Sequence, residues 1–383
     1  MWLPLDFNLS PEQERIREAI AKLCARFDDE YWAKRDREGG FPADFHEAFA
    51  RDGWLGIAMP EAYGGAGLGI SEAAIMMQAI AESGAGFSGA SAVHMNIFGL
   101  NPVVVFGNAE QKARMLPPLI AGRHRACFAV TEPNTGLNTR KIKTRAEKKG
   151  ERYFVSGQKV WISTAQVAEK VLLLTQAAAG LTLFYTDLDR KHVEVREIEK
   201  MGRHAVDSNQ VFFDALPVPE ADRIGEEGKG FEYILHGMNP ERILIAAELV
   251  GLGRCAVNRA AKYAKERVVF DRPIGQNQGI QHPLAANWMA LEAADLMAHK
   301  AAWLYDAGKP CGAEANAAKY LAGEACFDAC QQAVMTHGGF GYAREYHVER
   351  YLRESFVGRI APVSRELILC FIAERVLGLP KSY

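Results

Sequence analysis

The sequence predicts an α+β protein in which a central β domain lies between two helical domains. Residues 1–124 carry apolar side chains at helical spacing, and residues 229–383 carry long Ala- and Leu-rich helical patterns. Between them, residues 125–228 contain short runs of β-branched and aromatic residues broken by turn dipeptides. We therefore expect an N-terminal α-helical domain, a central antiparallel β-barrel and a C-terminal four-helix bundle.

The composition is typical of a globular protein with more than one core. A chain of 383 residues exceeds the usual size of one hydrophobic core, and its net charge of −2 predicts no nucleic-acid partner. Residues 1–10 show no leader pattern, and no uninterrupted apolar run approaches the roughly 20 residues of a membrane span. Seven scattered cysteines without a Cys-x-x-Cys pair predict core residues and no metal site. We expect a soluble cytoplasmic protein.

The N-terminal domain begins with a helix-start signal. Ser10, Pro11 and Gln13 form a capping-box pattern, and apolar residues then recur at helical spacing from Ile16. A Gly-rich break at residues 63–69 separates this region from a second helical stretch at 71–83. Further helices are expected as far as Leu119.

The central domain is expected to be antiparallel, because its strands follow one another without intervening helices. The candidate strands are residues 127–130, 141–146, 153–156, 160–163, 171–175, 181–185, 193–198 and 210–213.

One motif points to a nicotinamide enzyme. Residues 251–256 match the G-x-G-x-x-A dinucleotide fingerprint, and Asp271 lies at a suitable distance for a ribose contact. However, the preceding segment is Ala-rich and carries Glu248, and residues 268–270 are too short for a buried parallel strand. Close helix packing at the glycines is the preferred interpretation, with the nicotinamide enzyme as the alternative. The ten dispersed histidines are expected to be surface or packed residues.

The most informative segments are residues 128–138, FAVTEPNTGLN, and 159–164, KVWIST. Their amides and hydroxyl groups could bind the polar edge of a planar cofactor, with Trp161 covering one face. From the residues alone, an ordinary hairpin with a buried Trp explains them as well.

The order and spacing of several motifs resemble the acyl-CoA dehydrogenase family over essentially the whole chain. These motifs are Thr131-Glu132-Pro133 with Gly136, the strand from Gly157 to Ser163, Arg267-x-x-Phe270 with Gln278, and Gly338-Gly339 before Glu345-Tyr346.

The resemblance implies an FAD cofactor held by two groups of residues. Those matching the family's flavin-ring contacts are Phe128, Val130, Thr131, Trp161, Ile162 and Ser163, with Ser163 near flavin N5. The second group matches family segments that hold the FAD of a neighbouring subunit by its diphosphate and adenosine. Its residues are Arg267, Phe270, Gln278, Met335, Gly338 and Gly339. A homo-oligomer, a dimer of dimers, is therefore expected.

The resemblance also implies a catalytic base. Most relatives place a Glu where this chain has Pro362, which cannot accept a proton. A smaller group, typified by isovaleryl-CoA and long-chain acyl-CoA dehydrogenases, carries the Glu in a Glu-Arg-x-x-x-Ala context, which Glu241 and Arg242 match. We therefore expect Glu241 to be the base, with Arg242 and Asn239 contacting substrate. The alternative is a helix start, with Asn239 as N-cap and Pro240 in the first turn.

The implied activity is α,β-desaturation of a fatty or branched-chain acyl-CoA, with an electron-transferring flavoprotein as electron acceptor. The family's usual donor to the thioester carbonyl would be the backbone N–H at Ala361 or Pro362, but Pro362 has no N–H.

Leu137-Asn138 stands where relatives usually have Ser-Asp, so contacts to the pantetheine arm are expected to differ. The alternatives are a flavin oxidase or monooxygenase of the same fold, and a silent FAD- or acyl-CoA-binding protein.

Overall fold

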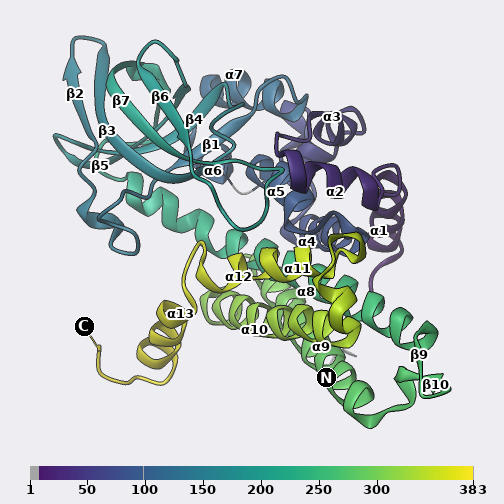
Figure 1. Cartoon of the computed structure of the whole chain (residues 1–383). Helices are drawn as coiled ribbons and strands as arrows, with labels where there is room; N and C mark the ends of the chain where they lie inside the picture. The colour runs from purple at the N-terminus through teal and green to yellow at the C-terminus, as the bar shows by residue number, and fades with distance from the viewer. Residues whose placement is uncertain (1–7, 98, 383) are drawn as a thin grey trace.

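The computed structural model describes residues 8–97 and 99–382, and Figure 1 shows their arrangement. Most of the segment in which we expected no leader, residues 1–10, lies outside the described residues. The three predicted regions are present: N-terminal helices, a β domain, and long C-terminal helices.

The N-terminal domain is helical, as predicted. Ser10 and Gln13 form the expected capping box, with hydrogen bonds of 3.2 and 3.0 Å. The predicted helix at 71–83 ends early, because Ala81–Ala85 forms a π turn in which Gly84 has φ +102°. The helices are α1 (Pro11–Cys24), α2 (Asp29–Glu38), α3 (Ala43–Arg51), α4 (Ile70–Ile80), α5 (Gly86–Ile97), α6 (Asn101–Phe106) and α7 (Ala109–Ile120).

The β domain is one open sheet, so the prediction of a closed barrel is wrong. Its strand order is β6-β7-β3-β2-β4-β5-β8, and β1 pairs with β4 in parallel, which also corrects the purely antiparallel prediction. The strands are β1 (Ala126–Ala129), β2 (Arg145–Lys149), β3 (Arg152–Ser163), β4 (Lys170–Ala177), β5 (Gly180–Asp187), β6 (Val193–Glu197), β7 (Ser208–Pro219) and β8 (Arg223–Ile224).

Two predicted strands, 153–156 and 160–163, form the single long strand β3. It stays paired with β7 throughout, with register shifts between Val155 and Gly157 and between Lys159 and Ile162. The sequence pattern breaks at these shifts because each one changes which side chains face the core. The predicted strand at 141–146 starts later, since Thr139–Lys141 forms a 3₁₀ turn.

The C-terminal domain contains three long helices that pack on one another. They are α8 (Gly230–Glu266), α9 (Gln278–Asp306) and α10 (Gly312–His337), followed by α11 (Val348–Ser355), α12 (Val357–Ile360) and α13 (Arg365–Phe371). A short hairpin, β9 (Val268–Val269) and β10 (Arg272–Pro273), joins α8 to α9. Figure 1 shows this hairpin at the side of the molecule opposite the β domain.

Helix α8 settles two interpretations of the sequence. Pro240 lies inside the helix, so the interpretation of Asn239 to Glu241 as a helix start is wrong. The glycines of the dinucleotide fingerprint also lie inside α8. A Cβ at Gly251 would come within 2.3 Å of the Gln78 carbonyl oxygen, so close helix packing is confirmed there.

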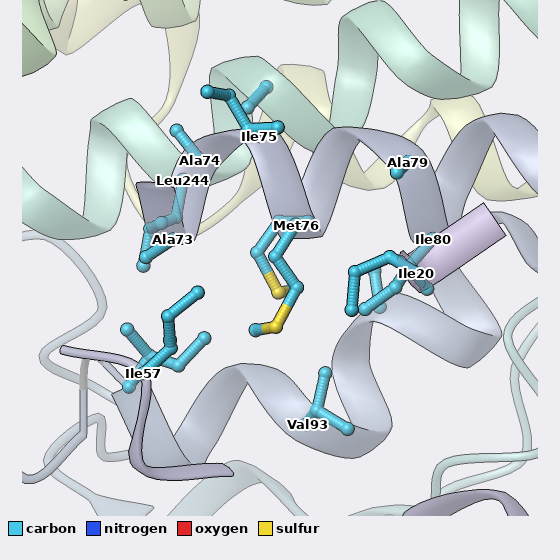
Figure 2. Close-up of a cluster of buried hydrophobic side chains, with 14 of the residues drawn as sticks. Ile20, Ile57, Ala73, Ala74, Ile75, Met76, Ala79, Ile80, Val93 and Leu244 are labelled. Atoms are coloured by element: carbon cyan, nitrogen blue, oxygen red, sulfur yellow. The ribbon is translucent and has the colours of Figure 1, made fainter. Parts of the chain in front are cut away.

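A shared apolar core joins the N-terminal helices to α8 (Figure 2). Helices α1, α4, α5 and α8 supply many of its members, among them Ile20, Met76, Ile80, Val93 and Leu244. Among the described residues, one stretch, Ile70–Phe106, is long and apolar enough by composition to cross a membrane. Much of it lies in this core, and 65% of its most apolar window is buried, as in a core helix of a globular protein.

Candidate functional site

Two carboxylates and one imidazole form a buried chain of hydrogen bonds between α5 and α8. Glu241 and Glu248 are seven residues apart on α8, which places both carboxylates on one face of the helix. His94 of α5 lies between them, with Nε2 2.7 Å from Oε2 of Glu241 and Nδ1 2.5 Å from Oε1 of Glu248. The exposed fractions are 5% for Glu241, 7% for His94 and 0% for Glu248. We call these three side chains the carboxylate–histidine cluster.

Packing between α5 and α8 holds this cluster in place. Val93 and Leu244, neighbours of His94 and Glu241, belong to the same buried apolar core, and Figure 2 shows both side chains directed into it. The start of α5 is fixed separately by Glu354 of α11, which accepts hydrogen bonds from two backbone N–H groups in the first turn, at 2.7 and 3.3 Å.

Burial and charge act in opposite directions on the cluster. Burial alone would lower the pKa of His94, but Glu241 and Glu248 outweigh it and raise the pKa to about 10. Burial raises the pKa of Glu248, and the charge of His94 offsets this only in part. Oε2 of Glu248 has no hydrogen-bond partner among the described residues. The cluster therefore holds an imidazolium at neutral pH and keeps a carboxylate oxygen that can take up a proton.

Arg203, in the loop before β7, connects the cluster to the β domain. Its guanidinium donates to Oγ of Ser163 at 2.9 Å and to Oγ of Ser91 on α5 at 3.3 Å. Its charge also acts on Glu248, lowering the pKa of that carboxyl against the effect of burial. Arg203 thus donates to Ser163, the predicted flavin contact, and acts through its charge on the cluster that contains Glu241, the predicted base.

Trp161 projects from β3 in a strained backbone conformation. Its φ is +61°, at the register shift between Lys159 and Ile162, and such a backbone costs about 1–3 kcal/mol for a residue other than Gly. The side chain is 60% exposed, so the alternative of a hairpin with a buried Trp is wrong. Ile162, by contrast, is buried in the β-domain core, and its carbonyl accepts a hydrogen bond from Asn209.

The turn after β1 is tied to β3 by a buried lysine. Nζ of Lys159 donates to the Val130 carbonyl at 2.9 Å and pairs with Glu132 at 3.0 Å. Burial lowers the pKa of Lys159 to about 8, although Glu132 acts in the opposite direction. The Thr131 carbonyl accepts a backbone hydrogen bond from β3 at 3.0 Å, and Phe128 packs against the cores of both adjoining domains. The predicted ring contacts therefore lie together at the adjacent ends of β1 and β3.

Arg242 has part of its guanidinium free beside Glu241. Its Nη1 donates to the Met238 carbonyl at 3.2 Å and to Oδ1 of Asn239 at 3.4 Å. Its Nε is buried and has no hydrogen-bond partner among the described residues. Burial lowers the pKa of Arg242, with Glu241 acting against it. The arrangement leaves one donor that a bound ligand can satisfy.

The segment at Pro362 does not supply the expected carbonyl donors. The Ala361 N–H donates to the Val357 carbonyl at 2.9 Å, and proline has no N–H. Lys319 of α10 donates to the Val363 carbonyl at 2.7 Å. Burial lowers the pKa of Lys319 to about 8, and the charge of Arg242 acts in the same direction.

The second predicted cofactor group lies at the far end of α8. Arg267, Met335, Gly338 and Gly339 all line one cavity of about 620 Å³. Phe270, 94% exposed, and Gln278, the first residue of α9, do not line it. Arg267 caps the C-terminus of α8, 26 residues beyond Glu241, a distance of about 39 Å at 1.5 Å per residue. The structure therefore places this second group far along α8 from the predicted base.

Sequence reasoning missed His94, Glu248 and Arg203. Glu241 and Glu248 had a detectable signal, because their spacing places them on one helix face. His94 had none, since its helix reaches α8 only through tertiary packing. We expected each histidine to be a surface or packed residue, and His94 is indeed packed in the interior. That expectation did not include the two carboxylates that His94 joins.

Comparison with family models identifies the protein. Residues 10–123 match the acyl-CoA dehydrogenase N-terminal domain, 127–216 the middle domain, and 228–377 the C-terminal domain. The chain belongs to the acyl-CoA dehydrogenase family. The protein is therefore an oxidoreductase of a flavoprotein family.

Relatives of this chain match most or nearly all of its length. Acyl-CoA dehydrogenase fadE12 of Mycobacterium bovis is 37% identical over 389 residues, 98% of this chain and 99% of that protein. Subunit CarC of the caffeyl-CoA reductase–Etf complex of Acetobacterium woodii is 32% identical and covers 83% of this chain and 86% of its own length.

Solved structures show the same fold. A glutaryl-coenzyme A dehydrogenase in complex with glutaryl-CoA has a TM-score of 0.94 at 28% identity, covering 99% of this chain and 98% of its own. An FAD complex of PigA has a TM-score of 0.93 at 25% identity, covering 98% and 100%.

The residues of this dehydrogenase fit an FAD in two ways. The strained, exposed indole of Trp161 has a free face beside the polar ends of β1 and β3, as a planar ring requires. A Cβ on Gly338 or Gly339 would meet no atom within 4 Å, so this backbone borders open space next to Arg267.

Proposed function

We propose that the chain is an FAD-dependent acyl-CoA dehydrogenase that converts an acyl-CoA thioester to the trans-2-enoyl-CoA. The observation that carries this proposal is the buried Glu241, which His94 joins by hydrogen bonds to Glu248. Arg203, which donates to the predicted flavin contact Ser163, acts on Glu248 through its charge. The other position that holds the base in related enzymes is Pro362, which has no titratable group. Bound FAD supplies the acceptor for the hydride that leaves the β carbon.

Glu241 removes the α proton in this proposal, and Arg242 orients the thioester. The side chain of Asn239 holds one end of the Arg242 guanidinium, which leaves the unpartnered Nε to donate to the substrate. That donor takes the place of the Ala361 N–H, which α12 already uses. A fixed cationic donor stabilises the enolate-like charge that develops on the carbonyl oxygen.

The Arg267 cavity serves the FAD of a second copy in this proposal. Arg267 and the turn at Gly338 and Gly339 bind the diphosphate and adenosine of that FAD. Within one chain, 26 residues separate Arg267 from Glu241, so the FAD bound there belongs to the active site of the other copy. A homotetramer, built as a dimer of dimers, satisfies this requirement, and we place the enzyme in the cytoplasm.

The electron acceptor is proposed to be an electron-transferring flavoprotein. The likeness to CarC, a subunit of an Etf complex, supports this partner. CarC is also named as part of a reductase complex, and a flavin oxidase of the same fold remains the second candidate. Rapid reoxidation of the reduced enzyme by oxygen would favour the oxidase.

Anaerobic titration of the FAD-loaded protein with straight, branched and cyclic acyl-CoAs tests the proposal. Bleaching of the flavin absorbance by one class would identify the substrate type, and an enoyl-CoA product identified by mass would establish the desaturation. A flavin that dithionite reduces but no thioester bleaches would overturn the proposal and leave the oxidase or a silent binding protein.

A further inference from the structure

We propose that His94 and Glu248 are positioning residues for Glu241, and that the three side chains accept the substrate's α proton as one unit. This inference rests on the proposed function, because it assigns the fate of the proton that Glu241 removes. Neither residue belongs to the motifs that identify the family, and both lie behind Glu241 in the buried interior.

The geometry of His94 fixes the orientation of the Glu241 carboxylate. Its imidazole is held at both nitrogens, at 2.7 Å by Glu241 and at 2.5 Å by Glu248, so the ring cannot turn without breaking a buried hydrogen bond. Oε2 of Glu241 is thereby engaged, and Oε1 is the oxygen left to meet the substrate. A base held in this way needs no reorientation before it accepts a proton.

The proton balance follows from the same contacts. In the starting state of this proposal, the His94 imidazolium donates to the carboxylates of Glu241 and Glu248. The α C–H bond breaks, its proton forms an O–H bond on Glu241, and the C–H electron pair becomes part of the new double bond. FAD, when bound, would accept the β hydride with its own electron pair. The Nδ1–H bond of His94 then breaks, and that proton forms an O–H bond on Glu248.

The α proton takes the net charge of the buried cluster from −1 to 0, and this second transfer then converts the remaining imidazolium–carboxylate pair into two neutral groups. Burial favours neutral groups, so the transfer offsets the cost of holding a proton on Glu241 beside an imidazolium. Glu248 can accept the proton because burial already raises its pKa and its Oε2 has no partner among the described residues.

Charged groups on four other parts of the chain act on this cluster. Arg242 lies next to Glu241 on α8, and Lys319 approaches from α10. Arg203 acts on Glu248 from the loop before β7, and Glu354 of α11 acts on Arg203 in turn. All of them stay in place in the variants described below, so a shift in the pH profile reports on His94 and Glu248.

Glu248→Gln tests the proposal because it removes one of the two carboxylates that keep His94 protonated. With that charge gone, the imidazolium that faces Glu241 is less favoured, and the base loses part of its cationic neighbour. The acid limb of the flavin reduction rate, measured anaerobically with saturating substrate, then moves up by about one pH unit, roughly a tenfold loss of rate on that limb. His94→Gln, which retains a hydrogen-bonding side chain without the charge, moves the limb in the same direction.

The matched control is Asp222→Asn. Asp222 is also buried and charged, but it pairs with Arg114 and Thr186 in and beside the β domain. Its removal can lower stability but leaves the acid limb in place. An unshifted limb in folded Glu248→Gln and His94→Gln enzymes would overturn the proposal.

A second measurement works without turnover. ¹⁵N-histidine NMR of the wild-type protein, with His94 assigned by its absence in His94→Gln, should show both ring nitrogens protonated beyond pH 8. A His94 that titrates near the usual 6.5 would contradict the cluster even if the variants do not fold. If no thioester reduces the flavin but His94 behaves as expected, the proposed function alone fails.

Discussion

Two regions of α8 differ in how completely one chain builds them: the Glu241 end, in the N-terminal third of the helix, and the Arg267 end, just past its last residue. At the Glu241 end, the carboxylates of Glu241 and Glu248 are buried and paired with His94 within the chain. At the Arg267 end, a cavity opens beside exposed apolar side chains, among them Phe270 at 94% and Met335 at 66%.

This difference indicates separate roles for the two regions, the reaction at the Glu241 end and assembly at the Arg267 end. Buried charges are tolerated only when they are paired, so the Glu241 end must be formed before any partner binds. Exposed apolar groups around a cavity are typical of an unfilled contact surface. We therefore expect substitutions at the first end to change the reaction or the fold, and those at the second to change FAD retention and oligomerisation.

Glu241→Gln should give the largest effect. The amide keeps the size of the side chain but cannot accept the α proton, so the rate of flavin reduction by an acyl-CoA should fall by about 10³-fold or more. FAD content and oligomeric state should not change. Stopped-flow reduction measures the rate, with the exposed Glu266→Gln on the same helix as control. Reduction within tenfold of wild type would remove Glu241 from the base role.

Lys159→Met should destabilise the fold by about 3–5 kcal/mol, because it leaves Glu132 buried without its cation. The difference should also depend on pH. Burial lowers the pKa of Lys159 from 10.5 to about 8, so between these values the unfolded chain binds the extra proton. The wild type should therefore gain stability over the variant as pH rises through this window. Urea unfolding at pH 7 and pH 10 measures both; a loss below 1 kcal/mol would contradict the buried pair.

Arg267→Gln tests the other end of α8. The loss of one cationic donor from the cavity should weaken FAD retention by about 10- to 100-fold and lower the oligomer fraction, with no change in the stability of the chain itself. Lys265→Gln is the matched control, since Lys265 is also exposed in the last turn but does not line the cavity. Equal FAD retention in the two variants, measured by dilution and gel filtration, would argue against the assigned role.

The sequence predicted the parts of this comparison that depend on local pattern. The capping box at Ser10, the order of helices and strands, and the packing glycines at 251–256 follow from spacing along the chain. The purely antiparallel prediction failed because β1 pairs in parallel with β4, a segment far from it in sequence. His94 was missed for the same physical reason: its partners are 147 and 154 residues away.

Trp161→Gly should have the smallest effect on stability, and it separates function from fold at the Glu241 end. Glycine accepts φ +61° without strain, which should recover about 1 kcal/mol or more, while the greater freedom of the unfolded chain should cost roughly 0.5–1 kcal/mol. The indole is 60% exposed, so little packing is lost, and the apoprotein should stay within about 1 kcal/mol of wild type.

The matched control is Ile162→Ala, at the next residue. It should cost about 2–4 kcal/mol because that side chain is buried in the β-domain core. The order reverses for the cofactor: Trp161→Gly should alter the visible spectrum of bound flavin, and Ile162→Ala should not. If Trp161→Gly unfolds the protein yet leaves the flavin spectrum unchanged, the strained indole is a structural feature of β3 and the ring site must lie elsewhere.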